Sequence, residues 1–279
     1  MQEVTFVIEK TKQPLNVRIK RAFRKDWQLF LMCLLPVIYF IVFHYLPMYG
    51  VQIAFKDFQA SKGIWGSSWV GFKYFKRFFE SYQFWPLIKN TLSLSLLQIL
   101  IGFPIPILLA ILLNQMKNQK FRQFVQTVTY CPHFISIVVL TGMLYIFLSP
   151  RTGLINNLIT SLGGDAKFFL GQPEWFRPIF VLSGVWQNAG WSAIIYIAAL
   201  AGISPDLYEA AKMDGANRWQ IIRHIDIPGI MPTVTMLLIM EMGKVMNIGF
   251  QKAYLMQNGL NIAASEIIPT YIYKIGLID

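Results

Sequence analysis

The residues best suited to specific contacts lie in one polar stretch, 204–229, which separates two apolar segments. Its carboxylates and guanidinium groups are Glu209, Asp214, Arg218 and Arg223. Such groups form charge-assisted hydrogen bonds with complementary side chains of another protein. Glu209 is followed by Ala210 and Ala211, and small side chains let a neighbouring surface approach closely. These residue types favour either a protein docking site or a helical hairpin resting on lipid headgroups, and they leave both open.

The order of residues in this stretch predicts a helix, a turn and a second helix. Ser204 is a good N-cap, and Pro205 suits the first helical position. Gly215 suits the position just past the helix end, where a left-handed conformation is needed. Asn217 can cap the second helix, and Pro228 is expected to end it.

A second group of polar and aromatic residues lies inside two apolar segments. Sugars bind aromatic faces through their C–H surfaces and polar side chains through their hydroxyls. The candidate solute-binding residues are Trp186, Asn188, Trp191, Tyr196, Glu241 and Asn247. Ionisable groups in a membrane usually face the protein interior or a water-filled cavity. Two alternatives remain: Glu241 can pair with Lys244, and the tryptophans can serve helix packing or interfacial anchoring.

The composition indicates that apolar segments of this kind make up most of the chain. Of its 279 residues, 55% are hydrophobic and 14% are charged, against about a quarter charged in an average soluble domain. The net charge of +11 is spread between apolar segments and forms no basic stripe, which disfavours nucleic acid as a partner. The three histidines are scattered, so no metal site is predicted.

The apolar segments predict an all-α integral membrane protein. A spanning helix needs about 20 mostly apolar residues. Five segments meet or nearly meet this criterion, at 28–48, 90–113, 124–148, 179–203 and 230–250. Pro104 and Pro106 predict a kink or a break in the second. The predicted organisation is a basic segment, 1–26, followed by a transmembrane domain, 27–279.

The basic residues predict the orientation of these spans in a multi-pass arrangement. Of 25 Lys and Arg residues, seven precede the first span, three lie between spans two and three, and three lie between spans four and five. Loops rich in Lys and Arg stay in the cytoplasm. The N-terminus and the stretch 204–229 are therefore predicted to be cytoplasmic. The loops 49–89, 149–178 and 251–279 are predicted to face outward, with an interfacial helix near 71–80.

The polar stretch resembles the Glu-Ala-Ala loop of the permeases of binding-protein-dependent ATP-binding-cassette importers. That family has Glu-Ala-Ala, three residues, Gly, nine residues and Ile-x-Leu-Pro. This chain has Glu209-Ala210-Ala211, Gly215 and Ile225-Asp226-Ile227-Pro228 at the same spacing, with Ile in place of Leu. The resemblance implies the type I importer fold and a bacterial inner or plasma membrane location.

Other segments resemble the subfamily that imports complex oligosaccharides. They are Tyr130-Cys131-Pro132-His133-Phe134-Ile135-Ser136, Gly153-Leu154-Ile155-Asn156, Gly190-Trp191 and the tail from Thr270 to Leu277. In that subfamily the tail precedes one more spanning helix. The resemblance therefore favours a sixth span beyond the five found in this sequence over the alternative of a five-span protein.

The resemblance also implies how the chain works. The Glu-Ala-Ala loop of the family forms a coupling helix that enters a groove of an ATPase subunit. The coupling residues carried over are Glu209, Ala210, Ala211, Asp214, Gly215, Arg218, Arg223 and Pro228. The implied partners are two ATPase subunits, a second, related permease subunit and an extracellular solute-binding protein. The chain lacks the G-x-x-x-x-G-K-[ST] phosphate loop, so ATP and Mg²⁺ are expected on the partner ATPase and no cofactor on this chain.

Three alternatives to an oligosaccharide importer remain at this stage. The same loop serves permeases for amino acids, metals or phosphate. A channel or secondary transporter would move solute without an ATPase, but would leave the loop without a purpose. A membrane enzyme such as a lipid-linked sugar transferase needs paired carboxylates or metal ligands near the bilayer surface, and the 14 acidic residues show no such pairing.

Overall fold

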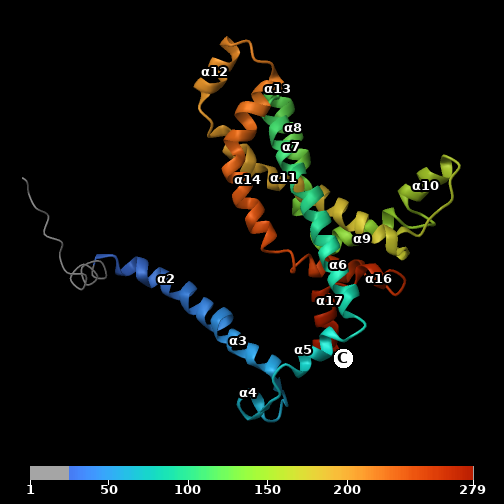
Figure 1. Cartoon of the computed structure of the whole chain (residues 1–279). Helices are drawn as coiled ribbons and strands as arrows, with labels where there is room; N and C mark the ends of the chain where they lie inside the picture. The colour runs from blue at the N-terminus through green and yellow to red at the C-terminus, as the bar shows by residue number, and fades with distance from the viewer. Residues whose placement is uncertain (1–24, 279) are drawn as a thin grey trace, which may run out of the picture. The chain divides into compact units, whose positions relative to one another are not determined.

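The computed structural model describes residues 25–278 (Figure 1). The chain divides into two compact units, the first ending at Ser81 and the second beginning at Tyr82, and each is described by itself. Apart from Lys25 and Asp26, the predicted basic segment 1–26 lies outside the described residues. The predicted all-α architecture is confirmed, with one pair of two-residue strands as the exception.

The first unit begins with a helical run that matches the predicted span 28–48 and extends beyond it. The run consists of α2 (Trp27–Phe40), the π-helical turn η1 (Ile41–Tyr45), α3 (Leu46–Met48) and the 3₁₀ helix η2 (Tyr49–Phe55). Its 29 residues correspond to about 44 Å, longer than the ~30 Å hydrocarbon core of a bilayer. None of its most apolar window is buried inside the chain. Such a surface is stable only against lipid or another protein.

A short β-hairpin and two helices complete the first unit. The strands β1 (Lys56–Asp57) and β2 (Ser68–Trp69) pair antiparallel and flank α4 (Gly63–Gly66). The buried Lys56 ammonium donates to the Ile64 carbonyl at 2.7 Å and lies over the Trp69 ring. Helix α5 (Lys73–Phe79) confirms the helix predicted near 71–80.

The second unit opens with one long helix where the sequence predicts 90–113. It comprises α6 (Phe84–Leu97), the π-helical turn η3 (Gln98–Gly102) and α7 (Pro104–Asn114). The prolines do not break it. Pro104 directly follows the π turn η3, and the irregular hydrogen bonding of that turn accommodates the missing N–H inside the continuous helix.

The segment predicted as a span at 124–148 is bent rather than straight. Helix α8 (Gln119–Tyr130) and the 3₁₀ turn η4 (Cys131–Phe134) are followed by α9 (Ile137–Phe147) at a bend of 99°. Ile135 and Ser136 are extended, and the Ser136 hydroxyl accepts from the Val139 N–H to start α9 afresh. The cap at Ser136 therefore starts a new helix inside an apolar segment that by composition alone predicts one span.

Helix α11 (Pro173–Ala201), the predicted fourth span, is the central element of the second unit (Figure 1). One core cluster joins it to α6 and the C-terminal helices, and contains Leu94, Leu170, Phe176, Phe180, Val181, Ala253, Met256, Ala264 and Ile267. The other joins it to α7 and α14, and contains Ala110, Ile111, Ala193, Tyr196, Leu200 and Ile230. Between α9 and α11 lie α10 (Leu154–Ser161) and the 3₁₀ turn η5 (Phe169–Gly171).

The segment after α11 differs from prediction at Pro228. Helix α12 (Pro205–Met213) turns 71° from α11, and α13 (Arg218–Ile221) leads through the π-helical turn η6 (Ile222–Asp226) into α14 (Ile227–Met242). Pro228 therefore does not end a helix. It lies inside the continuous helix 218–242, directly after the π turn η6, whose irregular hydrogen bonding accommodates the missing N–H. The predicted span 230–250 accordingly starts earlier and ends at Met242.

Four short helical elements complete the second unit: α15 (Phe250–Met256), α16 (Ile262–Ser265), α17 (Ile268–Tyr273) and the π-helical η7 (Lys274–Ile278). The Asn90 amide donates to the carbonyls of Ala263 and Glu266, and Arg177 donates to the Asn90 carbonyl oxygen at 2.9 Å. In residues 25–278, three helices are long and apolar enough to cross a membrane, or five if each bent pair counts as one span.

Candidate functional site

The polar stretch 204–229 forms a helical hairpin at the end of the second unit opposite α16 and α17 (Figure 1). The Ser204 hydroxyl caps α12 by accepting from the Asp206 N–H at 3.3 Å. Gly215 has φ +74°, a left-handed conformation in which other L-residues are strained. Asn217 and Gln220 form a reciprocal capping box at the start of α13, with distances of 2.7 and 2.9 Å. These three local predictions are confirmed.

The hairpin leaves its charged groups exposed and without ionic partners. Glu209, Asp214, Arg218 and Arg223 are all exposed, and none of the four forms an ion pair in the described part of the chain. Apolar groups are exposed beside them, with Met213 at 88% and Trp219 at 67%. A helix that presents unpaired charges among exposed apolar side chains has the composition of a protein contact. Ala210, Gly215 and Pro228 are exposed as well, and Ala211 is half-buried.

A buried carboxylate, Asp226, joins the hairpin to the helix bundle. Asp226 is fully buried, and its two oxygens accept from Gln115 Nε2 and from the Tyr208 hydroxyl, each at 2.7 Å. Tyr208 belongs to α12, Asp226 to η6, and Gln115 follows α7. Burial and the Asp226 carboxylate raise the pKa of Tyr208 to about 12, so its hydroxyl keeps the proton that it donates. Three elements are therefore held together at one carboxylate.

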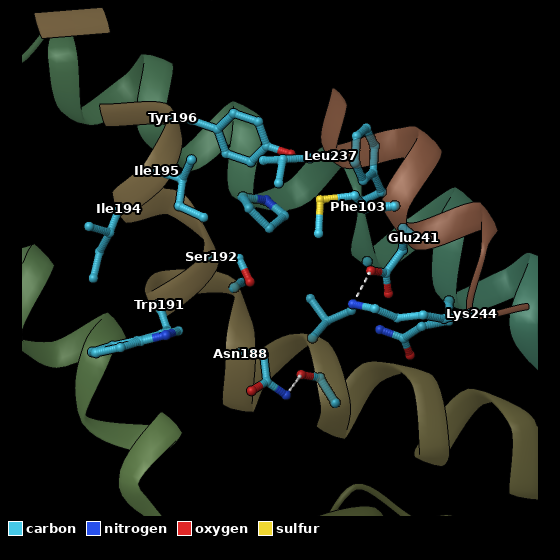
Figure 2. Close-up of a pocket in the computed structure, with 17 residues that line it drawn as sticks. Phe103, Asn188, Trp191, Ser192, Ile194, Ile195, Tyr196, Leu237, Glu241 and Lys244 are labelled. Carbon is cyan, nitrogen blue, oxygen red and sulfur yellow. Dashed lines mark hydrogen bonds and ion pairs between the residues drawn. The ribbon is translucent and has the colours of Figure 1, made fainter. Parts of the chain in front are cut away.

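A cavity of about 580 Å³ lies between α11, α14 and the π turn η3 (Figure 2). Of the candidate solute-binding residues, Asn188, Trp191, Tyr196 and Glu241 line it. Its volume is within the range of sites for small ligands. Glu241 and Lys244 pair with each other at 3.3 Å, which is the structural pairing left open by the sequence.

A smaller cavity of about 240 Å³ adjoins the first. The residues that line both are Gln98, Gly184, Asn188, Glu241 and Lys244. Asn247 lines the smaller cavity, whereas Trp186 lines neither and is half exposed. The structure thus groups all the candidate solute-binding residues except Trp186.

His133 lines neither cavity but contacts two residues that line the larger one, and the sequence did not single it out. Its ring stacks on Trp191 with centroids 4.5 Å apart and planes 3° from parallel. Its Nδ1 lies 3.1 Å from Asn188 Oδ1. Asn188 Nδ2 in turn donates to the Gly184 carbonyl. His133 comes from η4, at the bend between α8 and α9, so the bend positions the aromatic and amide groups of α11.

Comparison with known proteins decides the family. The family model described as "Binding-protein-dependent transport system inner membrane component" matches residues 102–277. The chain belongs to this family. It is the membrane-spanning permease subunit of an ATP-binding-cassette importer.

The relatives of this permease include two proteins of Bacillus subtilis (strain 168). The chain is 46% identical to the polygalacturonan/rhamnogalacturonan transport system permease protein YteP, over 98% of this chain and 84% of the relative. It is 43% identical to the protein LplB, over 92% of this chain and 80% of the relative.

A solved structure also resembles this permease over most of its length. The crystal structure is of a bacterial ABC transporter involved in the import of the acidic polysaccharide alginate, with TM-score 0.86 and 44% identity over 94% of this chain and 88% of that chain. The alginate transporter in complex with an alginate pentasaccharide-bound periplasmic protein matches equally well, with 87% of that chain covered. The predicted type I importer fold is confirmed.

Proposed function

We propose that this permease imports an oligosaccharide that an extracellular solute-binding protein delivers, and that residues 204–229 couple its movement to a cytoplasmic ATPase. The observation that carries the coupling role is the capped hairpin with four exposed charges that form no ion pair within residues 25–278. Such charges select a partner with complementary charges. The names of the relatives, which include polygalacturonan, rhamnogalacturonan and alginate, support a carbohydrate as the solute.

The same proposal sets the orientation and the partners. The N-terminus and the hairpin face the cytoplasm, where two ATPase subunits hold ATP and Mg²⁺. A second, related permease subunit completes the pathway as a heterodimer. ATP binding closes the ATPase dimer and pulls the two permease subunits from an inward-facing to an outward-facing state. This chain binds no nucleotide and catalyses no reaction in the cycle.

The cavity beside α11 supports the location of the solute site. Aromatic and amide groups meet there next to an ion pair, and aliphatic side chains such as Ile195 and Leu237 complete the wall (Figure 2). A sugar presents both C–H faces and hydroxyls, so it needs this mixture of apolar and hydrogen-bonding surface. We assign Asn188, Trp191 and Tyr196 to this role.

Transport by the reconstituted complex tests the proposed function. The permease, its partner permease and the ATPase subunits are placed in liposomes, and uptake of labelled oligosaccharides is measured with the binding protein outside and ATP inside. We expect uptake only with ATP, the ATPase subunits and the binding protein all present. Equal uptake by liposomes without the ATPase subunits would reject the coupling role. Uptake of amino acids or phosphate in place of sugars would reject the solute class.

The hydrogen bonds of Asp226 predict that movement of the hairpin is transmitted to the helix bundle through this carboxylate. Asp226→Leu removes the acceptor for both Tyr208 and Gln115, and each buried donor left unpaired costs about 1–3 kcal/mol. We expect oligosaccharide uptake to fall about tenfold while ATP hydrolysis continues, because α12 is no longer tied to the bundle. The measurement is the ratio of sugar transported to ATP hydrolysed.

Asp226→Asn is the matched control. Its amide oxygen still accepts from Tyr208, and a rotated Gln115 amide can accept from its nitrogen. Uptake by this variant should stay within about threefold of wild type, which is under 1 kcal/mol. Equal uptake by the Leu and Asn variants would refute the proposed role of the Asp226 contacts.

A further inference from the structure

Lys252, which the proposed function does not use, is a buried cation at the edge of the solute cavity. It lies in α15 and is 6% exposed. Its Nζ donates to the Phe180 carbonyl at 2.7 Å and lies 4.8 Å from the centroid of the Phe180 ring. An ammonium group has three N–H donors, so two remain beyond this carbonyl bond.

No carboxylate of the described second unit neutralises this lysine. The ion pairs in residues 82–278 join Lys244 to Glu241 and Lys274 to Glu266, at 3.3 and 3.1 Å. Burial lowers the pKa of Lys252 to about 7, because the charged form has lost its water. A buried charge without a partner is costly, so a lysine in this position has a reason beyond packing.

The unpaired ammonium borders the smaller cavity. Gly184 of α11 lies opposite it, and a Cβ on Gly184 would be 3.2 Å from Lys252 Nζ and 3.5 Å from Gln98 Oε1. Because Gly184 has no side chain, the Lys252 ammonium and the Gln98 amide both remain accessible at the cavity wall. The other ionisable groups of this wall, Glu241 and Lys244, pair with each other, so the lining has a net positive charge at Lys252.

We propose that Lys252 binds a carboxylate of the transported sugar, and that the solute is therefore an acidic oligosaccharide containing uronate residues. The proposal rests on the proposed import of an oligosaccharide and adds the chemical class. A carboxylate accepts the two remaining N–H groups and supplies the opposite charge that the site lacks. A neutral sugar supplies no opposite charge, so burial would keep much of Lys252 in its neutral form. In a cavity shielded from water such an interaction is stronger than at the surface.

The test compares an oligogalacturonate with its fully methyl-esterified form, which has the same length and linkage without the charge. Uptake of both is measured with the complete importer, its binding protein and ATP. We expect Lys252→Met to lower uptake of the acid about tenfold, with less than a twofold change for the ester. Lys252→Arg should keep most of the uptake of the acid, because it keeps the charge. The same binding protein is used with the wild-type and variant importers. Its preference for one sugar therefore cancels when the variant is compared with wild type on that sugar.

The outcomes separate this proposal from the proposed function. Uptake of neither sugar by the wild-type importer would count against the proposed function. Equal losses for acid and ester in Lys252→Met would show a structural lysine and overturn the proposal, as would no loss for the acid. If the Met variant does not assemble, acylation of Lys252 in the wild-type importer is measured by mass spectrometry. The oligogalacturonate should slow this labelling and the ester should not, and equal labelling with both overturns the proposal.

Discussion

Glu209→Lys is expected to lower ATP-driven uptake at least about 100-fold while the subunit still inserts and assembles in the membrane. The Glu209 carboxylate is exposed on α12 and forms no ion pair in the described chain, so the substitution disturbs no internal contact. Charge reversal at a protein contact places like charges together and costs several kcal/mol, and about 2.7 kcal/mol is already a factor of 100. The measurement is uptake by liposomes together with the ATPase rate stimulated by the loaded binding protein.

A charge reversal elsewhere on the surface serves as the control. Asp165 is also exposed and without an ion pair in the described residues, but it lies in the loop predicted to face outward. Asp165→Lys should leave the coupling of ATP hydrolysis to uptake unchanged. Wild-type coupling in Glu209→Lys, or an equal loss in both variants, would remove the hairpin from the mechanism.

Gly215→Leu tests the shape of the hairpin without altering its charge. With φ +74°, Gly215 has a conformation that costs another L-residue about 1–2 kcal/mol. No atom lies within 4 Å of the place where a Cβ would sit, so the backbone strain is the main effect. We expect weaker coupling, intermediate between wild type and Glu209→Lys. Normal coupling would mean that the turn does not set the direction of α12.

The parts of this site that sequence predicted correctly depend on near neighbours in the chain. Ser204, Gly215 and Asn217 act within three residues of themselves, so their types determine the turn and the caps. Asp226 was missed because its partners come from elsewhere in the chain. Gln115 lies 111 residues away, and only the packing of α7 against the hairpin region brings them together.

For Trp186 and Asn188, helical periodicity already argued against placing both in one solute site, and the prediction of that site did not use it. Two residues apart on a helix they lie about 200° apart around the axis, so they cannot both face one cavity. Asn188, Trp191 and Ile195 follow the three- and four-residue spacing of one face, and all three line the larger cavity.

The bend between α8 and α9 was missed for another reason. The apolar run conceals it, and only Pro132 and Ser136 mark it.

Gly190→Val is expected to destabilise the folded permease strongly. Gly190 lies in α11 where this helix crosses α8, and a Cβ there would overlap the backbone carbonyl of Thr129. Backbone cannot rotate out of the way as a side chain can, so the two helices must separate. Forcing extra carbon into a close contact costs about 1–3 kcal/mol or more. The separation would also displace η4, and with it the His133 ring that stacks on Trp191.

The measurement is the yield and thermal midpoint of the purified importer in detergent. A loss of about 3 kcal/mol corresponds to a midpoint lowered by roughly 6–12 °C in a chain of this size. Gly142→Ala in α9 is the matched control, because no atom lies within 4 Å of its added Cβ and alanine is the better helix former. The control should match or exceed wild-type stability. A stable Gly190→Val importer would show that α8 and α11 do not pack at this distance, and the position of His133 against the solute site would then need another support.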